Sequence, residues 1–128
     1  MSSVVRNITF DVAAPYEPYE IAQFWSLVVG HPVDPESEAD DDEVGLQMPE
    51  GQPMLLFIRV PEAKTVKNRV HVDLQPGQPR DAEVDRLVRL GAKLVDDQRR
   101  PDGKGWAVLS DPAGNEFCVE RSAAERAN

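Results

Sequence analysis

Two similar stretches decide the fold of this chain: PEGQPMLLF at residues 49–57 and PAGNEFCVE at residues 112–120. Each begins with a Pro-x-Gly turn and continues as an apolar run of the kind that forms a β-strand. A second pair lies upstream, ITFDV at residues 8–12 and VHVDL at residues 70–74, with an aspartate at the same place in each. The repeat period is about 62 residues, which predicts two copies of one supersecondary unit.

The first copy contains the pattern of one helix and four strands. Alternation of β-branched residues predicts a strand at 4–12, and apolar residues at helical spacing predict a helix at 19–29. Val33 fits a short strand, and residues 44–48 and 54–60 fit a hairpin. We therefore expect the order β-α-β-β-β in module one, at about residues 3–60.

The second copy repeats this order. Its expected elements are a strand at 69–75, a helix at 81–90, and strands at 93–98, 106–110 and 116–121. We place module two at about residues 69–121 and a linker at 61–68. Residues 122–128 are expected to form a frayed end. We treat residues 1–128 as a single domain made of the two modules.

Composition excludes several classes of partner. The net charge of −9 argues against binding to nucleic acid or to an anionic membrane surface. No apolar run approaches the length of a membrane span, and no signal peptide is visible. The single cysteine, Cys118, allows no internal disulfide, which suits a reducing compartment. We expect a cytoplasmic protein.

Four motifs carry a family resemblance: FW at 24–25 with Gly30, KNRVHVDL at 67–74, LGA at 90–92 and DPAGNEFCV at 111–119. With them the chain resembles the vicinal oxygen chelate superfamily, most closely its glyoxalase-like members from actinobacteria. The superfamily also includes glyoxalase I, extradiol dioxygenases and bleomycin-resistance proteins. The resemblance implies an α+β fold in which tandem βαβββ modules form a cup-shaped mixed sheet, and a homodimer.

The resemblance also implies a divalent metal ion, held by residues of the first and last strands of each module. In module two these positions are His71 and Glu120, an imidazole and a carboxylate that are both suitable ligands. In module one either Thr9 or Asn7 stands opposite His71, and Phe57 stands opposite Glu120 and cannot bind a metal. The site is therefore either open and completed by water or substrate, or not a metal site.

Further residues are candidates for a ligand pocket. Asp73 lies two residues from His71 on the same strand face, where it could orient the imidazole, act as a base or form a structural ion pair. The pocket candidates besides it are Asp11, Trp25, Phe57 and Trp106, and the aromatic ones among them fit a core equally well. Cys118 has no evident partner that would activate its thiol, so we expect it to be inert.

Two functions follow from the resemblance. The first is a lyase or isomerase that acts on a small oxygenated molecule, with His71 and Glu120 as acid/base groups or metal ligands and Asp73 positioning His71. The second is a non-catalytic protein that binds or sequesters a small, drug-like molecule. A further interpretation is a structural or interaction module whose cup is filled by its own side chains. The missing ligands of module one count against glyoxalase I and extradiol dioxygenase themselves. The ligand's identity stays open, as does whether a cup forms within one chain or across a dimer.

Overall fold

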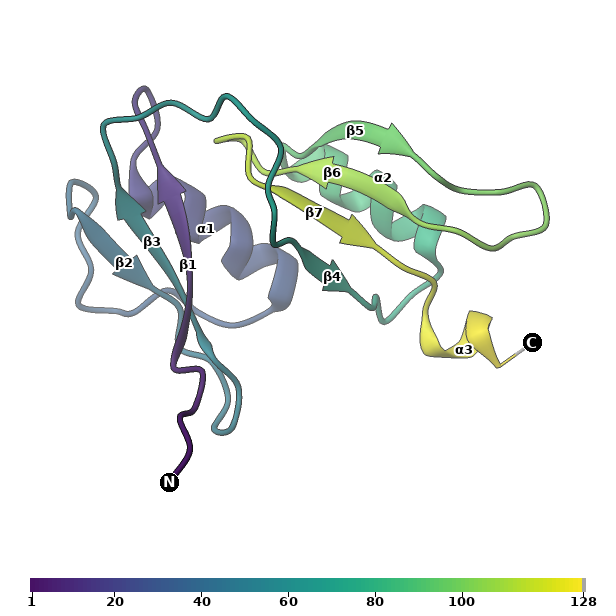
Figure 1. The fold of residues 1–128 in the computed structure, drawn as a ribbon, viewed down its shortest axis with the longest axis horizontal. Helices are drawn as coiled ribbons and strands as arrows, with labels where there is room; N and C mark the ends of the chain where they lie inside the picture. The colour runs from purple at the N-terminus through teal and green to yellow at the C-terminus, as the bar shows by residue number, and fades with distance from the viewer. Residues whose placement is uncertain (128) are drawn as a thin grey trace. The chain divides into compact units, whose positions relative to one another are not determined.

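The computed structural model describes residues 1–127, which divide into two compact units at the Lys64–Thr65 bond. Each unit consists of one β-sheet and one long helix that covers a face of that sheet (Figure 1). This is the predicted α+β class with tandem related modules. None of the described helices has the length and hydropathy that crossing a bilayer requires.

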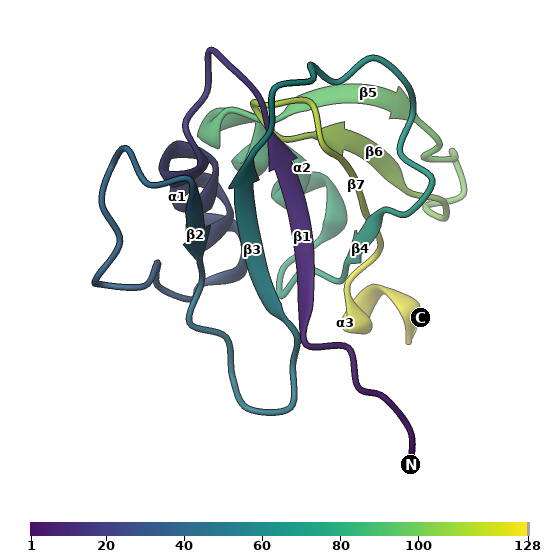
Figure 2. The ribbon, with the colours of Figure 1, turned by 60° about the vertical axis from the view of Figure 1, so that its left-hand side comes forward.

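Unit 1 has three strands and one helix. They are β1 (Asn7–Val12), α1 (Pro18–Val29), β2 (Glu43–Gly45) and β3 (Met54–Arg59). The strand order is β1-β3-β2, with β1 parallel to β3 and β2 antiparallel to it (Figure 2). The strand expected around Val33 is reduced to a single bridge between Val33 and Leu46.

Local sequence signals define both ends of α1. Pro18 occupies the first helical turn, where its missing N–H is not needed. Glu17 and Glu20 form a capping box in which the Glu20 carboxylate accepts a hydrogen bond of 3.0 Å from the Glu17 backbone N–H. The helix ends at Gly30, which adopts a left-handed conformation with φ of 75°.

An aromatic cluster forms the core of unit 1. The Phe10 ring lies 5.0 Å from the Trp25 ring and 5.1 Å from the Phe57 ring, measured between centroids. Phe24 meets Trp25 edge to face at 5.7 Å. Trp25 and Phe57 are 0% exposed. Such pairs stabilise the core beyond the burial of their surface, and they join α1 to β1 and β3.

Unit 2 has the full βαβββ order and a short additional helix. Its elements are β4 (Val72–Leu74), α2 (Arg80–Leu90), β5 (Lys93–Asp97), β6 (Ala107–Ser110), β7 (Glu116–Val119) and α3 (Ala123–Arg126). The strand order is β4-β7-β6-β5, and β4 runs parallel to β7. The prediction of a frayed tail is wrong for α3, because Ser122 and Glu125 form a capping box that starts this turn. Asn128 lies outside the described residues.

Hydrogen bonds at the ends of the parallel strand pairs show which positions of the two units correspond. The Val60 N–H donates to the Val12 carbonyl at 3.0 Å, and the Glu120 N–H donates to the Leu74 carbonyl at 2.9 Å. Val60 is therefore the counterpart of Glu120, and the prediction that Phe57 corresponds to Glu120 is wrong. The cause is the turn, because the first copy has three more residues than the second between its proline and this position.

The same register shows which residue of β1 corresponds to His71, a choice that the sequence left open between Thr9 and Asn7. Since Val12 corresponds to Leu74, Asp11 corresponds to Asp73, and Thr9 rather than Asn7 corresponds to His71. Phe57 corresponds instead to Phe117, and both rings are fully buried.

Buried Arg80 holds the loop between β5 and β6. Its Nη1 donates to three successive backbone carbonyls, those of Gly103, Lys104 and Gly105, at 3.3, 3.0 and 3.0 Å. Arg80 is only 4% exposed, so these bonds and its contact with Asp81 replace the water that its guanidinium loses. The loop is thereby fixed to the first turn of α2.

We predict that Gly105→Ala destabilises the protein more than Gly103→Ala. Both glycines have φ of 88°, so either alanine costs about 1–2 kcal/mol of backbone strain. At Gly103 the new Cβ meets nothing within 4 Å, whereas at Gly105 it would lie 2.0 Å from the Gln98 carbonyl oxygen. Urea unfolding of the two variants measures the difference, and equal losses of stability would contradict this account of the loop.

Candidate functional site

Pairing between β4 and β7 brings together three side chains of unit 2 that could ligate a metal ion. Asp73 lies directly opposite Cys118, and His71 precedes Asp73 by two residues, which places it on the same side of the sheet. His71 Nδ1 lies 3.1 Å from Asp73 Oδ1 and 3.8 Å from Cys118 Sγ. One ligand atom from each residue lies within 4.8 Å of the other two.

Asp73 determines which nitrogen of His71 is free. An ionised carboxylate can only accept a hydrogen bond, so His71 Nδ1 carries the proton and its N–H donates a hydrogen bond to Asp73. The lone pair then lies on Nε2, which has no hydrogen-bond partner among residues 1–127. The His71 side chain is 39% exposed, so this nitrogen can meet a small molecule.

Cys118 is protonated at neutral pH. It is 5% exposed, and burial is the main reason that the pKa of its thiol rises to about 11, with the neighbouring Asp73 carboxylate adding to the effect. A protonated thiol is a poor nucleophile, which agrees with the expectation of an inert cysteine. Its contribution to this site is therefore as a neighbour of His71 or as a metal ligand.

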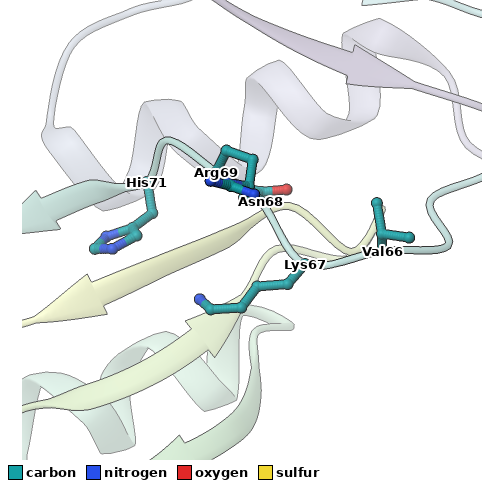
Figure 3. A pocket seen from close by; sticks show the side chains of 5 residues that line it. All are labelled: Val66, Lys67, Asn68, Arg69 and His71. Carbon is teal, nitrogen blue, oxygen red and sulfur yellow. The ribbon is translucent and has the colours of Figure 1, made fainter.

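A cavity of about 750 Å³ lies along the segment that leads into β4. It is lined by Val66, Lys67, Asn68, Arg69 and His71 (Figure 3). Asn68 fixes this segment to β7, because its backbone N–H donates to the Glu116 carboxylate at 2.9 Å and its side-chain amide donates to the Glu116 carbonyl at 3.3 Å. The volume suits a small organic molecule.

Glu120 and Trp106 lie at a different cavity of unit 2, of about 300 Å³. The Glu120 carboxylate forms an ion pair with Arg126 of α3. Glu120 is not part of the group formed by His71, Asp73 and Cys118. The structure thus brings together two of the three residues expected to be catalytic, while the third, Glu120, lies outside this group and acts on the Cys118 thiol only through its charge.

The remaining pocket candidates belong to unit 1. Asp11 is exposed on β1, on the face opposite to Phe10 and Val12. Trp25 and Phe57 were expected to line a ligand pocket, but their packing in the core of unit 1 leaves neither ring any exposed surface. This burial accounts for both rings without a ligand.

Cys118 is the member of the site that the sequence prediction did not include. Its alternation with Glu116 and Glu120 already indicated the correct face. What was missing was the register between β4 and β7, which places Cys118 opposite Asp73.

The donor set of the site fits a divalent metal ion. His71 offers a nitrogen, Asp73 an oxygen and Cys118 a sulfur, all of which are ligand types of zinc. Three protein ligands meet the minimum for a catalytic metal with an open position. A metal would have to displace the proton of the Cys118 thiol, since the raised pKa keeps that proton in place.

A family model described as the glyoxalase-like domain matches residues 7–120. The chain belongs to this family. The predicted resemblance to the vicinal oxygen chelate superfamily is thereby confirmed. Among curated proteins, none matches the sequence.

Solved structures with low sequence identity share the fold. A glyoxalase/bleomycin resistance protein/dioxygenase family enzyme from Burkholderia phytofirmans is 18% identical, with a TM-score of 0.63 over 87% of this chain and 94% of that one. Glyoxalase I of Leishmania major is 13% identical, with a TM-score of 0.68 over 98% and 91%. A mutant of the fosfomycin resistance protein FosX from Listeria monocytogenes, complexed with Mn(II) and a dihydroxypropylphosphonic acid, is 15% identical, with a TM-score of 0.67 over 98% and 95%.

We predict that iodoacetamide alkylates Cys118 slowly at pH 8 and faster as the pH rises toward 11. With a pKa near 11 instead of 9.0, the thiolate fraction at pH 8 falls about a hundredfold. Asp73→Asn removes a neighbouring negative charge and should shift the rate profile to lower pH. Asp11→Asn, at the corresponding position of unit 1, is the control and should leave the profile unchanged. A wild-type rate that is already maximal at pH 7 would contradict the assigned environment.

Proposed function

We propose that this glyoxalase-like protein binds a small oxygenated organic molecule in the cavity beside His71 and moves a proton on it, as a lyase or isomerase. The observation that carries the proposal is the hydrogen bond between Asp73 and His71 Nδ1, which leaves Nε2 unpaired on a residue that lines the cavity. A histidine oriented in this way by a carboxylate is suited to general acid/base chemistry.

Each residue of the site has a distinct part in this proposal. His71 Nε2 accepts a proton from the carbon next to a carbonyl group of the substrate and later returns it. Asp73 holds the imidazole in the required tautomer and stabilises the positive charge that appears on it. Lys67 lines the same cavity and offers a positive charge to an oxygen atom of the substrate.

A divalent metal is part of the proposal as a cofactor of the same site. His71, Asp73 and Cys118 would hold it, and as a Lewis acid it would polarise oxygen atoms of the substrate. In that form Asp73 serves as a ligand and no longer as the partner that fixes the tautomer. Metal titration by calorimetry on the wild type and on Cys118→Ser distinguishes the metal-bound form of the site from the metal-free form. Only the metal-bound form depends on the sulfur atom of Cys118.

We predict that the wild-type protein exchanges a carbon-bound proton of an α-hydroxycarbonyl compound for deuterium in D₂O. A panel of such compounds is incubated with the protein, and deuterium incorporation is followed by proton NMR. His71→Ala should slow the exchange by about 10²- to 10⁴-fold, because general base catalysis is lost. Asp73→Asn should slow it less, since the imidazole remains but its tautomer is no longer fixed.

His31→Ala is the matched control, because His31 is the second histidine and follows α1 in unit 1. It should exchange at the wild-type rate. A compound that raises the thermal stability of the wild type and of His71→Ala equally, without exchange in either, would overturn the enzyme proposal and favour the binding or sequestering function.

A further inference from the structure

The second cavity of unit 2 is strongly basic in an acidic protein. The seven residues that line it are Arg100, Lys104, Gly105, Trp106, Glu120, Arg121 and Arg126. They include four cationic side chains and one carboxylate, whereas the whole chain has a net charge of −9. Placing like charges together is unfavourable unless an anion joins them.

Two of these four cationic side chains have no ion-pair partner among the described residues. Glu120 pairs with Arg126, and the Arg100 guanidinium approaches Asp102 only to 3.9 Å. The Arg121 side chain has no hydrogen-bond or ion-pair partner among residues 1–127, and Lys104 makes no direct ion pair there but acts on Asp102 through its charge. Arg121 is half-buried and lines the cavity. Guanidinium groups bind carboxylates and phosphates through two parallel hydrogen bonds.

Trp106 adds an aromatic wall to the same cavity. It is 45% exposed, in contrast to fully buried Trp25. An indole ring beside arginine side chains offers a flat apolar surface on which a planar group can stack.

The walls of the cavity are fixed by one residue outside it. The Arg80 guanidinium binds the carbonyls of Gly103, Lys104 and Gly105 in one wall. The Arg80 backbone N–H donates to the Glu125 carboxylate of α3 at 2.8 Å, next to Arg126 in the other wall. The cavity is thereby held open before a ligand enters, which lowers the entropic cost of binding.

We infer that this basic cavity binds the anionic group, a carboxylate or a phosphate, of a small molecule that carries a planar ring. Arg121 and Lys104 contact the anion, and the ring stacks on Trp106. The inference goes beyond the proposed function, because it requires neither a metal ion nor a proton transfer at His71.

Glu120 acts as an internal competitor in this arrangement. Its carboxylate occupies Arg126, so an incoming anion meets a cavity in which one arginine is already neutralised. Removing the charge of Glu120 releases Arg126 and removes a repulsive group. Glu120→Gln should therefore bind anions more tightly than the wild type does.

Calorimetric titration tests the inference with four probes: phenyl phosphate, benzoate, inorganic phosphate and neutral benzyl alcohol. We expect one or both ring-bearing anions to bind, inorganic phosphate to bind more weakly, and benzyl alcohol to bind least. The comparison of phenyl phosphate with benzoate identifies the anion. Because Trp25 is fully buried, quenching of tryptophan emission by acrylamide reports on Trp106, and the bound ring should reduce it.

Variants locate the binding. Arg121→Gln should lower the affinity for the preferred ring-bearing anion about tenfold or more, because a charge-assisted contact is lost. Arg89→Gln is the control: it removes an exposed arginine at the end of α2 and should leave the affinity unchanged. Glu120→Gln should raise the affinity several-fold. His71→Ala should bind the anion normally, which keeps this result separate from the test of proton transfer.

Two results would overturn the inference. One is the absence of binding by both ring-bearing anions to wild type and to Glu120→Gln. The other is an equal loss of anion affinity in Arg121→Gln and Arg89→Gln. That result would show that the anion is attracted by the surface charge in general and does not bind at this cavity.

Discussion

The parallel pairing of β4 with β7 is the constraint on which the rest of unit 2 depends. It places Asp73 opposite Cys118 and ends with the bond from the Glu120 N–H to the Leu74 carbonyl. Because side chains alternate along a strand, a slip of one residue would move the reactive groups of β7 to the face covered by α2. The site therefore exists only in this register, and buried Phe117 and Val119 on the helix-facing side enforce it.

Comparison of corresponding positions shows how the two units have diverged. Unit 2 has His71, Cys118 and Glu120 where unit 1 has Thr9, Ile58 and Val60, while the aspartate of the first strand is present in both. Unit 1 thus combines the same strand pairing with apolar residues and an aromatic core. The candidate site of His71, Asp73 and Cys118 lies in unit 2, in which buried Arg80 also connects a loop and the C-terminal turn to α2.

The sequence predicted those features that depend on local patterns. Both long helices, the order of the elements and the shared face of His71 and Asp73 follow from periodicity and from the repeated phrases. Register does not follow from periodicity, and matching the phrases from their prolines paired Glu120 with Phe57 because the first turn is three residues longer. Trp25 was ambiguous for a similar reason, since an aromatic residue on an apolar helix face fits both a core and a pocket wall.

Some predictions depend on information beyond local patterns. The capping box of α3 was visible as Ser122 followed by Glu125, but a turn this short is rarely stable alone, and here the Glu125 carboxylate also accepts a hydrogen bond from the Arg80 backbone N–H. The homodimer stays a prediction from the family resemblance, and the cytoplasmic location stays a prediction from the composition of the sequence.

Whether Asp73 fixes the tautomer of His71 can be measured by long-range proton–nitrogen NMR of ¹⁵N-labelled protein. We expect neutral His71 to be protonated on Nδ1 and to have its lone pair on Nε2, and Asp73→Asn to shift the ring toward a mixture of tautomers. A wild-type His71 protonated on Nε2, and unaffected by Asp73→Asn, would show that Asp73 does not orient the ring and would contradict the account.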